Sequence, residues 1–122
     1  MSLATKRILC VDGNKDLCKL MEGFLKRVGF ECKTAGSISE ALLLATGEKF
    51  DVYVLENTFA DGTGLELCEM LREYDPVSPI IFYCVDPYEP TRQQALDAGA
   101  QERLFNDGDI NKLVETIRRL LS

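Results

Sequence analysis

The stretch "DVYVLENTFADGTGLEL" (residues 51–67) places an apolar run directly before a carboxylate and a loop with two glycines. Two further runs, "RILCV" (7–11) and "PIIFYC" (79–84), are also apolar on both faces. Continuous rather than alternating apolarity is typical of strands in a parallel sheet that is covered on both sides. With weaker strands at "FECKTA" (30–35) and "ERLF" (102–105), the pattern predicts five strands.

Helical patterns lie between the first four strands. Apolar residues recur every three or four positions after the first strand, which predicts an amphipathic helix ended by Gly29. Its expected buried face is Leu17, Leu20, Met21, Phe24, Leu25 and Val28. The next two helices are predicted to begin at capping boxes, Ser37 with Glu40 and Thr63 with Glu66. Their expected ends are Gly47 and the residues before Pro76, and the third helix is expected to bury Leu67, Met70 and Leu71.

Two more helices complete the pattern. Pro90 is predicted to start the fourth, which Gly99 stops, and Asp109 is predicted to cap the fifth. Strand and helix therefore alternate five times, without a linker or an internal repeat. The expected fold is α/β, a doubly wound parallel sheet of five strands with five helices on both faces.

The composition limits the classes of function. The chain has 122 residues, enough for one domain and one core, and a net charge of −6 with a pI near 4.7. Such acidity argues against direct nucleic-acid binding and against anionic membranes. No apolar stretch approaches the roughly 20 residues of a membrane span. The opening Met1–Leu3 is interpreted as a leader and carries no argument.

Cysteine and histidine content narrows the chemistry further. The five cysteines form no C-x-x-C pair and fall mostly in apolar patterns, which predicts a reduced, cytoplasmic protein with thiols used as small hydrophobic groups. The chain has no histidine. This excludes Ser-His and Cys-His dyads, histidine-ligated metals and phosphohistidine transfer.

Four positions follow directly from the predicted strands. Asp12, Glu56, Cys84 and Asn106 stand at or just beyond the carboxyl ends of four of them. In parallel sheets these ends meet at one edge, where functional groups gather. We therefore expect the four side chains to lie close together.

The segments that carry these positions are "ILCVDGN", "FDVYVLENTFADGTGLEL", "PIIFYCVD" and "AGAQERLFNDGD". They resemble the four signature segments of the receiver domain of two-component response regulators, and the resemblance runs from Arg7 to Leu121. It implies a flavodoxin-like sheet of order 2-1-3-4-5 and a single receiver-like domain over residues 4–122. A flavodoxin itself is not expected, because no Ser/Thr-rich phosphate loop follows the first strand.

The resemblance implies a specific chemistry for the family. An aspartate after the third strand accepts a phosphoryl group, and it holds Mg²⁺ together with two acidic residues after the first strand. A Ser or Thr after the fourth strand and a Lys after the fifth bind the phosphoryl oxygens. An aromatic residue on the fifth strand reports the phosphorylated state to partners.

This sequence departs from that pattern at most positions. Asp12 matches the first acid and Gly64 matches the family glycine that opens the third helix. The departures are Gly13 for the second acid, Glu56 for the acceptor, Cys84 for the hydroxyl, Asn106 for the lysine, Asp107 for the proline after it, Arg103 for the aromatic and Ala60 for the loop proline.

The changes all weaken the same reaction. Glu56 carries its carboxylate about 1.5 Å further out than an aspartate, and a misplacement of about 1 Å costs on the order of a hundredfold in rate. Asn106 cannot offset the phosphoryl charge, and Cys84 is a weak donor. Only Asp12, Glu56 and the Thr58 carbonyl remain as Mg²⁺ ligands, so the metal is expected to bind weakly or not at all. No enzymatic activity is expected, and no other cofactor.

Several roles stay open for individual residues. Glu56 is either a mimic of the phosphorylated state or an inert carboxylate bonded to Asn106 or to loop amides. Asp12 is a metal ligand or a solvated carboxylate, and Cys84 is a redox sensor or a buried thiol. Asp61 is an alternative acceptor or part of an ordinary turn. Arg103 pairs with Glu102, Asp107 or a partner protein, or it is an exposed charge at a strand end.

The sequence favours a pseudo-receiver, a phosphorylation-independent interaction module in two-component or phosphorelay signalling. Its partner, a signalling protein or a second copy, is expected on the face of the fourth helix, fifth strand and fifth helix: Glu89, Arg92, Gln93, Arg103, Lys112 and Arg118. One alternative is an active phosphoacceptor that uses Glu56 or another carboxylate with Mg²⁺. Another is a small-ligand sensor that uses the altered pocket.

Overall fold

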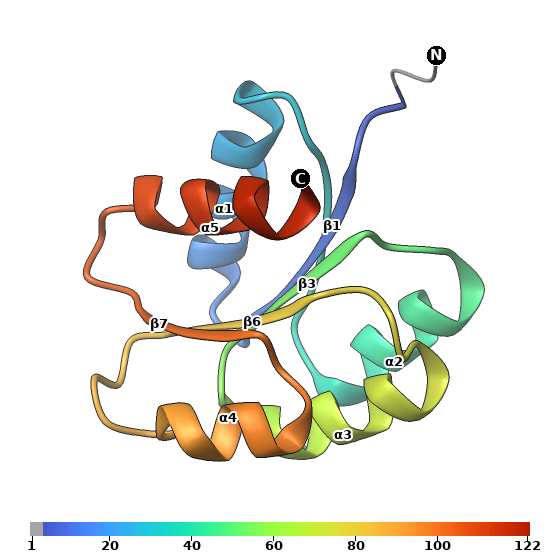
Figure 1. Cartoon of the computed structure of the whole chain (residues 1–122), viewed down its shortest axis with the longest axis vertical. Helices are drawn as coiled ribbons and strands as arrows, with labels where there is room; N and C mark the ends of the chain where they lie inside the picture. Colours follow the sequence, from blue (N-terminus) through green and yellow to red (C-terminus); the bar gives the residue numbers. More distant parts are fainter. Residues whose placement is uncertain (1–3) are drawn as a thin grey trace.

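A computed structural model describes residues 4–122, so the predicted leader lies outside the described residues. Five parallel strands form one sheet in the order β2-β1-β3-β6-β7 (Figure 1). Counted along the sheet-forming strands alone, this is the predicted order 2-1-3-4-5. The strands are β1 (Arg7–Val11), β2 (Glu31–Ala35), β3 (Val52–Leu55), β6 (Ile80–Cys84) and β7 (Glu102–Phe105).

Five helices cover the two faces of this sheet. They are α1 (Lys15–Arg27), α2 (Ile38–Gly47), α3 (Gly64–Tyr74), α4 (Arg92–Ala98) and α5 (Asn111–Leu121). Figure 1 shows α1 and α5 on one side and α2, α3 and α4 on the other. The predicted doubly wound α/β fold is confirmed.

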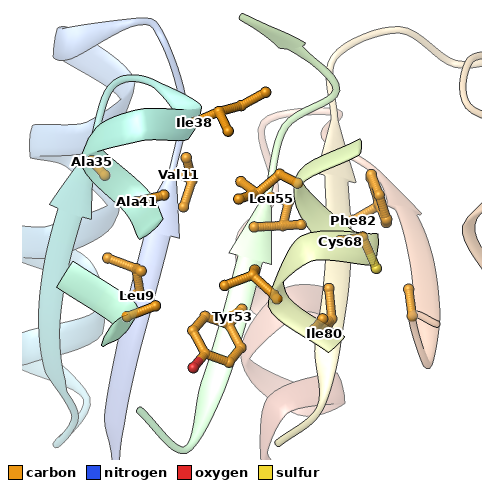
Figure 2. Close-up of a cluster of buried hydrophobic side chains, with 14 of the residues drawn as sticks. Leu9, Val11, Ala35, Ile38, Ala41, Tyr53, Leu55, Cys68, Ile80 and Phe82 are labelled. Atoms are coloured by element: carbon orange, nitrogen blue, oxygen red, sulfur yellow. The ribbon is translucent and has the colours of Figure 1, made fainter. Parts of the chain in front are cut away.

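The continuous apolar runs are explained by two separate cores. Alternate residues of each strand point to opposite faces. Leu9, Leu55 and Phe82 face α2 and α3 in the cluster of Figure 2. Ile8 and Val54 face α1 and α5 instead. Because helices cover both faces of the sheet, the residues of these runs that point to either face are apolar.

The predicted starts of α2 and α3 are confirmed, with one difference in detail at α2. Thr63 and Glu66 form the full capping box of α3. Ser37 caps α2 by accepting from the Glu40 amide at 3.1 Å, but the Glu40 carboxylate reaches back to the amide of Gly36. The second half of that predicted capping box is therefore displaced by one residue.

The starts of α4 and α5 differ from the prediction. Thr91, not Pro90, caps α4, because its hydroxyl accepts from the Gln94 amide while Gln94 accepts from the Thr91 amide. The N-cap position of α5 is Ile110, which makes no side-chain capping bond. The Asp109 carboxylate instead accepts from the Asn111 amide at 3.0 Å, within a local turn.

Three further expectations need correction. Leu20 is 69% exposed and Met70 is 43% exposed, so both lie off the buried face of their helices. The segment after β3 is more than a turn: β4 (Thr58–Phe59) and β5 (Gly62–Thr63) form a small antiparallel ladder before α3.

All five cysteines are free and buried, as their apolar setting predicts. The Sγ atoms of Cys10 and Cys32 lie 3.7 Å apart on neighbouring strands. Within residues 4–122, no helix is both long enough and apolar enough to cross a membrane.

Candidate functional site

The carboxyl edge of the sheet collects the residues predicted from the strand ends. The ladder pairs Val11 with Leu55 and Cys84 with Phe105, so β1, β3, β6 and β7 end at the same edge. Asp12 and Glu56 follow directly from paired residues. The predicted arrangement of the strand ends is therefore confirmed. Of the four side chains expected to lie close together, those of Asp12 and Glu56 line one cavity, whereas those of Cys84 and Asn106 do not.

A cavity of about 350 Å³ lies at this edge. Asp12, Glu56 and Thr58 line it, as do Asp86 and Glu89 from the connection between β6 and α4. Its lining thus has four carboxylates and, among the described residues, no lysine or arginine. Neither Cys84 nor Asn106 is part of this lining.

Glu56 is bonded to the backbone through both carboxylate oxygens. Its Oε1 accepts from the amide of Asn57 at 2.7 Å, and its Oε2 accepts from the amide of Val85 at 3.1 Å. The first bond folds the side chain back on its own strand end, and the second ties β3 to the residue after β6. Of the two interpretations for Glu56, the bonds fit a carboxylate held by loop amides.

Asp12 is buried rather than solvated, with 8% of its surface exposed. Its Oδ1 accepts from the Asn14 amide at 2.8 Å. Burial raises the pKa of the Asp12 carboxyl, the bond from Asn14 opposes that shift, and the charge of Glu56 adds to it. The interpretation as a solvated carboxylate at the start of α1 is wrong.

The donor set fits Mg²⁺ poorly. This ion needs near-octahedral oxygen ligands, whereas Gly13 supplies no side chain and both Glu56 oxygens already accept from amides. Within residues 4–122, no group of three or more acidic, cysteine or histidine side chains is arranged to hold a metal. We therefore assign no chemistry to a metal here.

Cys84 lies behind the cavity and is fully buried. Its Sγ is 3.9 Å from the carbonyl oxygen of Leu55. Burial raises the pKa of the thiol well above its ordinary value, and the negative charge of Glu56 raises it further. A protonated, inaccessible thiol is a poor nucleophile, so the geometry argues against the redox-sensor interpretation.

Asn106 is bonded through its backbone to β6 and through its side chain to its own connection. Its backbone N–H donates to the Cys84 carbonyl at 2.7 Å, and its side-chain oxygen accepts from the amide of Gly108 at 3.1 Å. Of the two partners predicted for an inert Glu56, Asn106 or loop amides, the bonds within residues 4–122 are those to loop amides. Asn106 closes a turn after β7.

Arg103 is neither an exposed charge at a strand end nor paired with Glu102 or Asp107, so both of these predictions for it are wrong. Its guanidinium donates to the carbonyls of Asp86, Glu89 and Pro90 at 2.5, 2.9 and 2.8 Å. These three acceptors belong to the connection between β6 and α4, and a longer bond of 3.3 Å goes to the carbonyl of the adjacent Leu104. The side chain is partly buried and links β7 to that connection.

The predicted interaction face changes in composition. Arg118 donates to the carbonyl of Val28 and lies over the ring of Phe30, so it faces α1 and β2. Glu102 is bonded instead to Arg119 at 3.0 Å, with Arg92 at 3.8 Å. The face of α4, β7 and α5 therefore carries Glu102 and Arg119, with Arg118 removed from it.

Asp61, predicted as an alternative phosphoryl acceptor or as part of a turn, links two segments of the chain. Its two carboxylate oxygens accept from the amides of Ile38 and Ser39 at 3.0 and 3.1 Å. These bonds lower the pKa of the Asp61 carboxyl. The residue thus attaches the loop before α3 to the start of α2.

Gly64 is required by close backbone approach. A Cβ atom at this position would lie 2.3 Å from the carbonyl oxygen of Glu56 and 2.8 Å from Phe82. The Gly64 amide also donates to the Asn57 carbonyl at 2.8 Å. This glycine holds α3 against the end of β3.

Sequence reasoning did not place several of the residues that line this cavity, among them Asn57, Asp86 and Glu89. Asp86 and Glu89 line the cavity, and their position shortly after the strand at 79–84 was the available signal. Asn57 also lines it, and its buried Oδ1 has no hydrogen-bond partner. No local pattern distinguishes that oxygen from one that is solvated.

A larger cavity of about 620 Å³ lies at the opposite edge, lined in part by Thr46, Tyr74 and Val77. One of its three carboxylates, Asp75, already accepts from the amides of Val77 and Ser78 and from the hydroxyl of Tyr53. Asp75 thus links α3 and the segment after it to β3.

Comparison with known proteins identifies the class. The family model of the response regulator receiver domain matches residues 8–118. The response regulator protein PilR of Pseudomonas aeruginosa is 29% identical over 119 residues, which cover 98% of this chain and 27% of PilR. The alkaline phosphatase synthesis transcriptional regulatory protein PhoP of Bacillus subtilis is 31% identical over 117 residues, covering 93% of this chain and 49% of PhoP.

Solved structures agree with these relatives. A two-component response regulator from Clostridium difficile superposes with a TM-score of 0.90 at 27% identity, covering 96% of each chain. The response regulator TrrA from Thermotoga maritima, in complex with Mg²⁺ and BeF, gives 0.89 at 25% identity and covers 96% of this chain and all of that one. The chain belongs to the receiver domain family of two-component response regulators. It spans between 27% and 49% of the length of the two curated relatives.

Proposed function

We propose that this receiver domain acts without phosphoryl transfer, as an interaction module in two-component signalling. The observation that carries the proposal is the state of Glu56, whose two oxygens both accept backbone amides. Each oxygen of this carboxylate is already engaged as an acceptor. Attack on phosphorus by either oxygen would disturb the amide bond that this oxygen accepts.

The charge of the cavity supports the same proposal. Four carboxylates line it, and Asn106 stands where the family has a lysine. A phosphoryl dianion would meet like charges without a fixed cation to offset them. A missing stabilising group of this kind typically costs about 3 kcal/mol, on the order of a hundredfold in rate.

A signalling partner or a second copy would then bind the face of α4, β7 and α5. This face combines Arg92, Glu102 and Arg119 in a mixed-charge set, with Gln93 and Lys112 exposed beside it. Mixed charges favour specific pairing over tight non-specific adhesion.

The direct test is incubation with acetyl phosphate and Mg²⁺, followed by intact-protein mass spectrometry. We expect no phosphoryl adduct on the protein as it stands or on Glu56→Asp alone. A combined variant, Glu56→Asp with Gly13→Asp, Asn106→Lys and Cys84→Thr, should label. Gly13 has room for a side chain, since the nearest atom to a Cβ there is 3.8 Å away.

Efficient labelling of the unmodified protein would instead make it an active phosphoacceptor. The modified residue, located by peptide mapping, would show whether Glu56 or another carboxylate serves. Labelling of Glu56→Asp alone would show that side-chain length is the sole obstacle and would overturn the proposed role of cavity charge.

A further inference from the structure

The connection between β6 and α4, residues 85–91, is held from both sides by charged groups of neighbouring strands. Arg103 of β7 donates to the carbonyls of Asp86, Glu89 and Pro90. Glu56, after β3, accepts from the Val85 amide. One cation therefore satisfies three backbone carbonyls of this loop, and one anion satisfies a backbone N–H.

The loop adds bonds of its own. The Asp86 carboxylate accepts from the amides of Tyr88 and Glu89 at 2.7 and 3.0 Å. Thr91 then begins α4 with a capping box. Since backbone polar groups along the loop are bonded in this arrangement, each alternative conformation would have to break several of these bonds at once.

This bonding leaves apolar side chains in solvent. Tyr88 is 79% exposed and Val85 is 55% exposed. They project from a loop whose backbone is fixed, so binding them would cost less conformational entropy than ordering a mobile loop. A loop with a fixed backbone and exposed apolar side chains is therefore suited to bind a partner protein.

The charge around these side chains selects one kind of partner. Glu56, Asp86 and Glu89 line the adjoining cavity, and Asp107 and Asp109 are exposed on the neighbouring connection after β7. The guanidinium of Arg103 is bonded to carbonyls. The buried Oδ1 of Asn57, in the wall of the same cavity, lacks a donor.

We propose that Arg103 is a positioning residue that fixes the loop of residues 85–91 as a permanent docking surface for a partner segment with basic and apolar side chains. A partner's arginine or lysine would complement the carboxylates, supply donors to the cavity and stack on the exposed ring of Tyr88. This rests on the proposed function, because a surface set without phosphorylation suits a phosphorylation-independent module.

The positioning role is tested by amide hydrogen exchange of Arg103→Ala, with Arg27→Ala as the control. Arg27 is an exposed arginine in the last turn of α1, outside both the loop and the face of α4, β7 and α5. We expect exchange of residues 85–91 to rise on the order of a hundredfold in Arg103→Ala, well beyond any change in β1 and β3, since the opening is local. An equal rise across the whole sheet, or none in the loop, would overturn the role.

The docking role is tested by NMR with a short synthetic peptide of arginine and leucine, and with its twin carrying glutamate for every arginine. We expect saturable shifts at residues 85–91 with the arginine peptide alone, weakened about tenfold by Tyr88→Ser, or roughly 1.4 kcal/mol. Arg103→Ala should weaken binding as well, whereas Arg27→Ala should not. No shifts, shifts elsewhere, or equal shifts with both peptides would overturn it.

The two proposals fail separately. A phosphoryl adduct formed with acetyl phosphate would defeat the phosphorylation-independent function while leaving the exchange and peptide results unchanged. Normal exchange in Arg103→Ala would defeat the positioning role while leaving the protein unlabelled.

Discussion

The two flanks of the carboxyl edge satisfy their charges in opposite ways. On the β1–β3 flank, carboxylates of Asp12 and Glu56 accept from backbone amides. On the β6–β7 flank, the guanidinium of Arg103 donates to backbone carbonyls. Glu56 and Arg103 bind the same loop from its two sides. Glu56 accepts from Val85, and Arg103 donates to carbonyls of residues 86–90.

The comparison explains how a receiver fold is compatible with an altered site. In each flank the charged group is bonded to the protein's own backbone. Hydrogen bonds that involve a charged group contribute about 1.5–3 kcal/mol. Residues that depart from the family pattern thus contribute to the stability of this loop.

The largest expected effect concerns the β1–β3 flank. Gly64→Ala should lower the free energy of unfolding by about 3 kcal/mol, because the added Cβ would lie 2.3 Å from the Glu56 carbonyl oxygen and force the backbone apart. Denaturant unfolding measures it. The control is Gly23→Ala in α1, where nothing lies within 4 Å of a new Cβ. That variant should be neutral or stabilising by up to about 1 kcal/mol, and equal losses in both would contradict the account.

A smaller effect is expected when the anion is removed. Glu56→Ala should lower the free energy of unfolding by about 2 kcal/mol, because the amides of Asn57 and Val85 lose their acceptor. Glu89→Gln in the same cavity is the control and should change stability by less than about 0.5 kcal/mol. If Glu56→Ala were neutral, the bonds to the loop would carry no stability.

The smallest effect concerns Asp12 and depends on pH. Burial raises the pKa of Asp12 in the folded protein, so the folded state binds this proton more tightly than the unfolded state does. The charged form therefore destabilises the fold at neutral pH, and this cost disappears once both states are protonated. Asp12→Asn should stabilise the protein at about pH 7 by less than about 1 kcal/mol.

The gain from Asp12→Asn should vanish on acidification to about pH 3, where the natural residue is protonated in both states. Unfolding curves of the two proteins across this range check it. A gain that stays constant with pH would show that packing rather than charge is responsible.

The fold follows closely from local patterns. The apolar runs at 7–11 and 102–105 coincide with β1 and β7, and the other strands differ by one residue at an end. Thr63 and Glu66 form the predicted capping box. These features depend on neighbours in sequence, so the sequence contains the information needed to predict them.

The sequence predicts where the site lies, but it predicts few of the hydrogen bonds that its residues make. The positions of Asp12 and Glu56 at one cavity follow from strand ends. The bonds of Arg103 could not be predicted, because its acceptors are backbone carbonyls 13 to 17 residues away in another connection. Any residue type offers such carbonyls, so no sequence pattern marks them.

The most direct test of the central claim is the amide NMR spectrum of the protein before and after addition of Mg²⁺ and beryllofluoride, an anionic analogue of a phosphoryl group. Residues 85–91 report whether the loop responds. The account predicts no saturable change in these amides, whereas the variant that combines Glu56→Asp, Gly13→Asp, Asn106→Lys and Cys84→Thr should respond. A saturable shift of residues 85–91 in the unmodified protein would contradict a loop held permanently by Glu56 and Arg103.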